Sequence, residues 1–325
     1  MKPAFVAIVV AVAVLCALAY GAAMRMQWPT CSDVIRYTRL ETLRYLTGRT
    51  VVITGGNSGI GLHLAAAFSR IGARVVIGCR DLESARAVPA RVIPLDLTSP
   101  FSVEQFAAVA TGGDQIALVV FNAGMFPSDA MQLVDSTGIE RCFATNHVGH
   151  FQLARAMRSA LAPDGRFVFV SSGSQNGPIS LSDAESTEQW RGVSRPNART
   201  YSALHAYGSS KLANSLCARY FHMLGTDSRA VWPGVLITTG ISRHRSALER
   251  FVFRHVIARF TMSADQGAAG VLWACLEPGL SGKCVNQFRP VPEPQINVSD
   301  KAAAALAFVT DELLRPVAPP RSAQK

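Results

Sequence analysis

The sequence predicts an α/β fold in which one doubly wound, parallel sheet carries helices on both faces. Two observations lead to this prediction. Short β-branched runs alternate with segments of helical spacing, and a glycine-rich turn joins the first run to the first helix. Strands that alternate with helices are typical of a parallel sheet buried on both sides. A chain of 325 residues is long enough for one such domain, which we expect over residues 48–315.

The first element is an uncharged run of 22 residues, Pro3–Met24. A helix needs about 20 residues to cross a bilayer, and the run is longer than the apolar core of a signal peptide, about 7–15 residues. We therefore predict an N-terminal transmembrane helix, a signal anchor within residues 1–26. A cleaved signal peptide is the alternative, because Ala17-Leu18-Ala19 offers small residues at a plausible cleavage site.

The charges around this run predict its orientation. Lys2 stands upstream, whereas Arg25, Arg36, Arg39 and Arg44 follow downstream. The side richer in Lys and Arg normally stays cytosolic. We expect a single-pass protein of the endoplasmic reticulum membrane with its main domain in the cytosol. The secretory lumen is the alternative if the segment is cleaved, and Asn297-Val298-Ser299, a formal glycosylation sequon, is weak support for it.

Strand and helix signals then alternate along the chain. A basic amphipathic linker at residues 27–47 comes first. The predicted strands are Thr50–Thr54, Arg74–Gly78, Arg91–Leu95, Gln115–Phe121 and Arg166–Ser171, with one more opening at Val231. The predicted helices are Ile60–Ile71, a region around Gly138–Leu161, and Tyr207–Leu224, with an unusually short helix between the second and third strands. Residues 316–325, rich in Pro and basic side chains, are expected to be disordered.

The turn after the first strand has the pattern of a dinucleotide-binding site. Its sequence is Thr54-Gly55-Gly56-Asn57-Ser58-Gly59-Ile60-Gly61. Gly55, Gly59 and Gly61 permit a tight turn, close backbone approach to a pyrophosphate, and packing of the helix on the sheet. The N-terminus of the following helix offers unpaired N–H groups to the phosphates. This placement in a strand–turn–helix unit predicts a Rossmann-type fold.

The end of the second predicted strand indicates which dinucleotide is bound. A carboxylate there binds the adenosine ribose hydroxyls, whereas an Arg accommodates a 2′-phosphate. The strand ends in Gly78-Cys79-Arg80, with Asp81 following. Arg80 therefore predicts NADP(H) in preference to NAD(H). A solvated surface Arg is the alternative interpretation.

Composition excludes other classes of protein. With 49% hydrophobic and 17% charged residues, the chain does not have the composition of a disordered protein. The net charge of +10 is scattered and lacks an aromatic-and-basic recognition pattern, so we predict no nucleic-acid partner. Anionic lipid or a phosphorylated cofactor explains the excess charge at least as well. The seven cysteines have no metal-ligand spacing, which predicts reduced thiols and no metal site.

Tyr207 and Lys211 form the candidate catalytic pair. They are four residues apart near the start of a predicted helix, so they lie on one helical face. A neighbouring ammonium favours a phenolate and lowers its pKa. Such a pair can donate or accept a proton, as general acid–base catalysis requires. Ser172, at the end of a predicted strand, is suitably placed to hydrogen-bond a substrate carbonyl oxygen.

With these motifs together, the chain resembles the short-chain dehydrogenase/reductase family over roughly Gly48–Leu314, and within it the retinol dehydrogenase-like branch. The matching stretches are TGGNSGIG at 54–61, CRD at 79–81, DLTS at 96–99, NAG at 122–124, TNHVGHF at 145–151, SS at 171–172, YGSSKLAN at 207–214, and PG at 233–234 with Thr238. Many independent motifs in one order and spacing make a chance match negligible.

The resemblance implies a role for each matching residue. Tyr207 is implied as the proton donor or acceptor, with Lys211 tuning it and binding ribose, Ser172 polarising the carbonyl, and Asn146 completing a proton relay through water. The implied cofactor-binding residues are Gly55, Asn57, Ser58, Gly59, Ile60, Gly61, Arg80, Asp96, Leu97, Asn122, Ala123, Gly124, Tyr207, Lys211, Pro233 and Thr238. Members of the family often pair through helices, which makes a homodimer an open expectation. Taken only from its own sequence, Asn146 is also compatible with a buried amide that kinks a helix.

Departures from the family pattern leave the substrate open. Phe121 stands where many relatives have Asn, and Trp232 where His is common. The stretch between Arg80 and Asp96 is short, and so is the one from Leu224 to Pro233, which could alter the sixth strand. Ser172 and Tyr207 are 35 residues apart, which is longer than is typical. The insertion at 173–206, with Trp190, could reshape the substrate pocket.

The function we predict is NADP(H)-dependent interconversion of a lipophilic alcohol and its aldehyde or ketone, in the manner of a retinol dehydrogenase. The nicotinamide supplies the hydride and Tyr207 handles the proton. The predicted membrane anchor favours an apolar substrate. A non-catalytic NADP-binding scaffold or sensor is one alternative, and a reductase of steroids or other non-retinoid carbonyls is another.

Overall fold

The computed structural model describes residues 28–113, 115–128, 130–234, 262–291 and 297–315. Its centre is one eight-stranded sheet with the order β3-β2-β1-β4-β5-β6-β7-β8. Every neighbouring pair is parallel except β7 and β8. This order, with the chain moving outward in both directions from β1, is the doubly wound Rossmann-like arrangement. The predicted α/β fold is confirmed.

The strands have two to ten residues, and the central ones are largely apolar. They are β1 (Thr50–Thr54), β2 (Arg74–Cys79), β3 (Arg91–Pro94), β4 (Ile116–Phe121), β5 (Leu161–Val170), β6 (Asp227–Trp232), β7 (Cys284–Asn286) and β8 (Arg289–Pro290). All residues of β1 and β4 are buried, as expected for central parallel strands covered on both faces.

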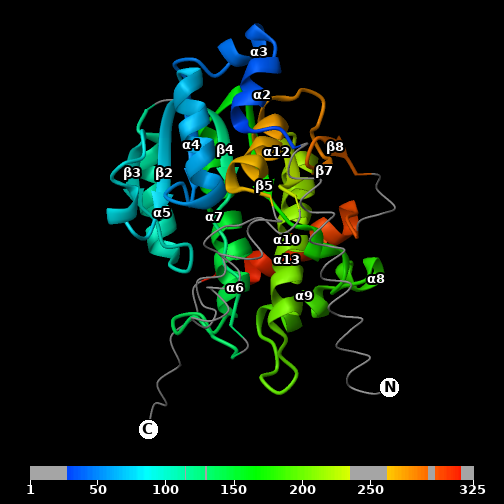
Figure 1. The fold of residues 1–325 in the computed structure, drawn as a ribbon. Coiled ribbons are helices and arrows are strands. Elements are labelled where there is room, and N and C mark those ends of the chain that lie inside the picture. Colours follow the sequence, from blue (N-terminus) through cyan, green and yellow to red (C-terminus); the bar gives the residue numbers. More distant parts are fainter. Residues whose placement is uncertain (1–27, 114, 129, 235–261, 292–296, 316–325) are drawn as a thin grey trace, which may run out of the picture.

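The helices cover both faces of this sheet, as Figure 1 shows. The α-helices are α2 (Cys31–Tyr37), α3 (Leu40–Arg44), α4 (Gly59–Ile71), α5 (Pro100–Thr111), α6 (Arg141–Phe143), α7 (Gly149–Met157), α8 (Leu181–Ala184), α9 (Thr187–Ser194), α10 (Ala203–Met223), α12 (Ala264–Leu276) and α13 (Asp300–Leu313). Short 3₁₀ turns are η1 (Glu83–Ala85), η3 (Arg158–Ala160) and η4 (Gly173–Asn176), and η2 (Ala144–Val148) is a π-helical turn.

Alternate residues of β1 face opposite cores. Val51 and Ile53 of β1 pack into the cluster formed with α2, α4 and α12. Val52, between them, packs into the cluster formed with α5, α7 and α10. A third cluster, which includes Trp190 of α9, joins α10 to α13. This alternation follows from the two-residue period of a strand.

The segment before the first strand packs on the domain. Thr30 caps α2 with reciprocal bonds to Asp33, and Cys31 and Val34 are buried against α12. After α3, the Tyr45 hydroxyl donates to the Asp164 carbonyl at 2.7 Å.

Several predicted segments fall outside the described residues. They are the transmembrane run Pro3–Met24, the tail 316–325 and Thr238. Within the described ranges, none of the helices combines the length and apolar character needed to cross a bilayer.

Some predicted boundaries were wrong. The last predicted strand was to open at Val231, but β6 begins at Asp227 and pairs in parallel with β5 over five residues, so the short preceding connection does not disrupt it. The strand predicted from Arg166 begins at Leu161. The helix predicted from Tyr207 begins at Ala203, because Ser202 caps it by accepting from the His205 N–H.

The insertion at 173–206 forms η4, α8 and α9. Trp190 is fully buried and its indole N–H donates to the Ala184 carbonyl at 2.8 Å. Arg191 forms an ion pair with Glu312 of α13 at 3.0 Å. Most of the insertion is therefore attached to α13, and only its first turn, η4, stays beside Ser172.

Candidate active site

The candidate catalytic side chains meet where the parallel strands end. Ser172 follows β5, and the N-terminal half of α10 carries Tyr207 and Lys211 past it. Gly124, after β4, completes the group. A Cβ on Gly124 would stand 3.3 Å from Lys211 Nζ and 3.4 Å from Asn146 Oδ1. Residues from four separate parts of the sequence are thus brought together at the carboxyl edge of the sheet, where α/β folds bind ligands.

Tyr207 is held in a protonated state by its surroundings. Burial raises the pKa of Tyr207 to about 12, while the Ser172 hydroxyl, within hydrogen-bonding reach of the phenol, lowers it. The ring packs against Phe126 with centroids 5.0 Å apart. The spacing to Lys211 predicted a lowered pKa for this phenol. That prediction was wrong for this arrangement, because burial has the larger effect.

Lys211 is buried beside Tyr207 and has an altered proton affinity. Its Nζ lies 5.7 Å from the centre of the Tyr207 ring and donates to the Val170 carbonyl at 3.0 Å. Burial lowers the pKa of Lys211 to about 8. The hydrogen bond to the Val170 carbonyl therefore fixes the orientation of the ammonium group. Because its pKa is closer to neutral pH, Lys211 releases its proton more readily than a surface lysine does.

Asn146 lies in the π-helical turn η2, between α6 and α7. Its Oδ1 accepts from the Met125 N–H at 2.8 Å, and its Nδ2 donates to the Met125 carbonyl at 3.0 Å and to Ser210 Oγ at 2.9 Å. Single π-helical turns are frequent at functional sites. Asn146 is thus both a buried amide in a distorted helix and a neighbour of Lys211, and one or two waters are enough to link them.

A buried chain of hydrogen bonds joins Asn146 to the glycine turn. Thr54 Oγ1 accepts from the N–H groups of Asn122 and Ala123, each at 2.9 Å. Its own proton then goes to His150 Nε2 at 2.9 Å, so His150 Nδ1 carries the ring proton and donates to the Asn146 carbonyl, also at 2.9 Å. Burial lowers the pKa of His150 to about 3, which keeps the ring neutral.

The glycine turn fits a pyrophosphate. Gly55 and Gly59 have φ values of 67° and 54°, where side chains are strained. A Cβ on Gly61 would meet the Gly55 carbonyl oxygen at 2.3 Å. Ser58 precedes α4 without capping it by a side-chain bond, so the first N–H groups of α4 are left for another acceptor.

The adenosine end of the predicted site lies beside this turn. Asn57 Nδ2 donates to Ser84 Oγ at 2.7 Å, which ties the turn to the segment that follows Arg80. Arg80 is exposed directly after β2. Asp96 Oδ1 accepts from the Thr98 N–H at 2.9 Å, and Leu97 is buried. Ile60 is the second residue of α4.

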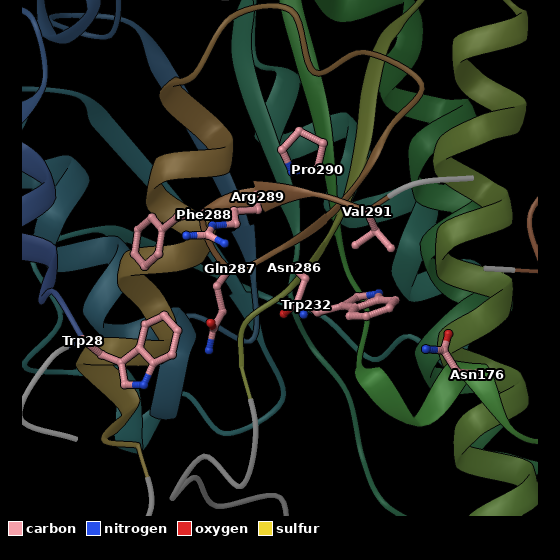
Figure 2. A pocket seen from close by; sticks show the side chains of 9 residues that line it. All are labelled: Trp28, Asn176, Trp232, Asn286, Gln287, Phe288, Arg289, Pro290 and Val291. Carbon is pink, nitrogen blue, oxygen red and sulfur yellow. The ribbon is translucent and has the colours of Figure 1, made fainter. Parts of the chain in front are cut away.

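Of the two residues predicted to border the nicotinamide, Pro233 lies within the described residues and Thr238 does not. Pro233 is buried immediately after β6. Beside it, at the ends of β6 and β7, a cavity of about 540 Å³ opens (Figure 2). This cavity is lined by Trp28, Asn176, Trp232, Asn286, Gln287, Phe288, Arg289, Pro290 and Val291.

Sequence reasoning missed several of these contributors. Thr54 and His150 stand inside the matching motifs but were given no role, because their bond spans 96 residues of sequence. Gln175 was also missed; its Oε1 accepts from Ser171 and Ser215, each at 2.6 Å, and so joins the strand that ends at Ser172 to α10. Trp28 precedes the predicted domain, and nothing in its neighbourhood signalled a role at the cavity.

Comparison with known proteins places this geometry in a family. The sequence model described as short chain dehydrogenase matches residues 49–182. The human WW domain-containing oxidoreductase is 31% identical over 302 residues, which cover 86% of this chain and 71% of that protein. Human retinol dehydrogenase 12 is 31% identical over 291 residues, covering 83% of this chain and 87% of the relative. The chain belongs to the short-chain dehydrogenase/reductase family.

Solved structures agree with this assignment. An uncharacterised protein from Mycobacterium paratuberculosis has a TM-score of 0.59 and 30% identity, and the match covers 83% of this chain and 96% of that one. A short-chain dehydrogenase from Burkholderia cenocepacia, solved in complex with NADP, has a TM-score of 0.56 at 21% identity and covers 74% of this chain and 97% of that one; it shows the shared fold. As a member of the family, the protein is a nicotinamide-dependent dehydrogenase/reductase that acts on small-molecule alcohols or carbonyls.

Proposed function

We propose that the protein reduces a lipophilic aldehyde or ketone to its alcohol with NADPH. The observation that carries the proposal is the meeting of Tyr207, Ser172 and Lys211 at the carboxyl edge of the sheet, within reach of the glycine turn through Gly124. Human retinol dehydrogenase 12, similar over most of its length, supports an apolar substrate of this kind. The similarity to WW domain-containing oxidoreductases keeps steroids and other non-retinoid carbonyls as competing substrates.

The protonation states favour the reductive direction. With its pKa raised to about 12, Tyr207 keeps its proton at neutral pH and is ready to donate it to a carbonyl oxygen. Ser172 hydrogen-bonds the same oxygen as negative charge develops there. Bound NADPH supplies the hydride to the carbonyl carbon. Lys211, with a pKa of about 8, returns a proton to Tyr207 through its neighbours.

For the cofactor, we propose NADP(H) over NAD(H). The exposed guanidinium of Arg80 stands at the end of β2, where a 2′-phosphate is accommodated in this fold. The Arg80→Glu exchange should raise the KM for NADPH by at least about tenfold and leave that for NADH nearly unchanged, since an ion pair with phosphate is replaced by repulsion. Steady-state kinetics with both cofactors measure this. Arg39→Glu, an exposed charge exchange between α2 and α3, is the matched control. Equal effects of Arg80→Glu on both cofactors would contradict the assignment.

We also propose a membrane location with the domain in the cytosol. The uncharged run Pro3–Met24 and the basic residues after it support this placement. The sequon does not oppose it, because Asn297 Nδ2 donates to the Ile179 carbonyl and the Ser299 hydroxyl caps α13 in the folded domain. Protease protection of the full-length protein in sealed microsomes tests the orientation, and a protected domain would contradict it.

The reaction is tested with NADPH, NADH and a panel of retinal, steroid ketones and lipid aldehydes. We expect turnover with NADPH, and we expect Tyr207→Phe to lower kcat by about two to four orders of magnitude, because the proton donor is lost while the ring remains. Titration of NADPH into this variant should show that the cofactor still binds, with an affinity lowered by no more than about tenfold. Tight NADPH binding without turnover of any carbonyl by the native protein would instead indicate a non-catalytic NADP-binding sensor.

A further inference from the structure

Two residues that line the cavity in Figure 2, Asn176 and Trp232, belong to segments of the candidate site. Asn176 closes the 3₁₀ turn η4, which begins directly after Ser172. At a rise of about 2 Å per residue, this turn places Asn176 roughly 8 Å along the chain from Ser172. Trp232 precedes Pro233, at the end of β6. The volume of about 540 Å³ is that of a site for a small organic molecule.

Aromatic rings lie on two sides of the cavity. Figure 2 shows Trp28 and Phe288 at one side and Trp232 at the other, with the amides of Asn286 and Gln287 between them. Trp28 and Phe288 are stacked, with ring centroids 6.5 Å apart and an angle of 16° between the planes. Trp273 of α12 braces Phe288 edge-on at 5.9 Å. A slot between fixed aromatic rings favours a flat, apolar ligand body.

The charge of the lining is one-sided. Among the nine lining residues, Arg289 is a cation and none is acidic. Arg289 is exposed at the start of β8, and no ion pair is found for it within the described part of the chain. A guanidinium at the rim of an aromatic slot suits a carboxylate or a phosphate at the far end of a ligand.

Trp232 lies on the opposite side of the cavity, and only 7% of this residue is exposed. Its indole N–H is fully covered and finds no acceptor among the described residues. Trp232 therefore contributes its ring to the lining, and we assign no hydrogen bond to a ligand from it.

We propose that this cavity binds the non-reacting body of an amphipathic carbonyl substrate, whose anionic end pairs with Arg289 and whose carbonyl faces Ser172 and Tyr207. The inference rests on the proposed reductase function and narrows its substrate class to flat, apolar carbonyls that carry an acid group. Trp28 is then a specificity-determining residue from outside the stretch 49–182 that matches the family model.

A matched pair of rigid aldehydes tests the inference. Biphenyl-4-carbaldehyde and its 4′-carboxylate have the same reacting group and differ in the charge at the far end. We expect the native full-length protein to have a kcat/KM at least about tenfold higher for the carboxylate, which corresponds to one charge-assisted contact. Arg289→Gln should abolish this preference by raising the KM for the carboxylate. Arg39→Gln, an exposed Arg away from the cavity, should keep the preference.

A second variant separates the contribution of the aromatic rings to substrate binding from that of the Arg289 charge. Trp28→Ala should raise the KM for both aldehydes to a similar extent, because it removes one aromatic wall. Equal kcat/KM values for the two aldehydes in the native protein, or a preference that survives Arg289→Gln, would overturn the inference while the reductase function stands.

A different result is expected if the protein is not a reductase at all. If neither aldehyde is turned over, calorimetric titration of biphenyl-4-carboxylate tests whether the cavity binds an anionic ligand independently of catalysis. Binding that weakens about tenfold in Arg289→Gln, but not in Arg39→Gln, would support the cavity as an anion-ended site without reductase activity. Binding that does not depend on Arg289 would overturn the inference.

Discussion

Lys211 holds its charge at a position where burial opposes it, and this has a measurable effect on stability. Its pKa falls from 10.5 to about 8 in the folded protein, so between these values the unfolded chain binds more protons and stability rises with pH. We expect the free energy of unfolding of the native protein, relative to Lys211→Met, to be flat below about pH 8, to rise by about 3 kcal/mol up to about pH 10.5, and then to level off.

Denaturant unfolding of both proteins across this pH range measures the difference. Other groups that titrate there, such as buried thiols, are common to both and largely cancel. A difference that stays constant between pH 8 and pH 10.5 would show that Lys211 keeps an ordinary pKa.

His150 bridges Thr54 and the Asn146 carbonyl, so its substitution tests whether this hydrogen-bond chain positions the cofactor-binding residues. His150→Phe keeps a ring against Phe121 but leaves the Thr54 hydroxyl proton without its acceptor and removes the side-chain donor to the Asn146 carbonyl, at about 1–3 kcal/mol each. We expect the KM for NADPH to rise about tenfold or more, since Thr54 positions the N–H groups of Asn122 and Ala123.

The conservative variant separates positioning from general destabilisation. His150→Gln offers both a donor and an acceptor and should recover much of the NADPH affinity. If His150→Phe lowers the melting temperature but leaves the KM for NADPH unchanged, His150 has only a structural role.

At the scale of single residues, the sequence predicts side chains whose partners are close in sequence. Tyr207 and Lys211 share one helical face, so their spacing was sufficient. The tie between Thr54 and His150 was not predictable, because helix α7 and strand β1 meet only after the sheet has formed. The direction of the Tyr207 pKa was mispredicted for a related reason: spacing identifies a neighbouring charge but not the extent of burial.

At the scale of elements, the glycine turn makes a sharp prediction. A Cβ on Gly61 would stand 2.3 Å from the Gly55 carbonyl oxygen and 2.6 Å from Asn122 Nδ2. Gly61→Ala must therefore displace the turn, and we expect it to abolish measurable NADPH binding. Gly192→Ala, inside α9 with no atom within 4 Å of the new Cβ, is the control and should stabilise the protein by up to about 1 kcal/mol. Equal NADPH affinities in the two variants would contradict the cofactor site.

The elements that were predicted correctly are those whose sequences show a clear hydrophobic pattern. The central strands are continuous β-branched runs, and β1 has the predicted bounds, Thr50–Thr54. Helix α12 was missed because it is apolar on nearly all sides: it packs between α2, α4 and the sheet and shows no polar stripe. Strand β7 is only three residues long, too short for any periodic signal.

At the scale of the whole molecule, segments from both ends of the described chain complete the site. Trp28 lies before the first strand and Arg289 follows the seventh, yet both line one cavity together with Asn176 and Trp232. The insertion at 173–206 was expected to reshape the substrate pocket, but apart from η4 it is packed on α13 through Trp190 and Arg191. Such long-range arrangements depend on tertiary packing, and local sequence patterns carry no information about them.

The central claim is that the chain reduces carbonyl compounds with the proton supplied by Tyr207. The most direct measurement uses NADPH that carries deuterium at both C4 positions and a lipophilic aldehyde, followed by mass spectrometry of the alcohol. We predict one deuterium on the carbinol carbon, formed by the native protein and reduced by at least about a hundredfold with Tyr207→Phe. An alcohol without deuterium, or equal yields from the two proteins, would contradict the account.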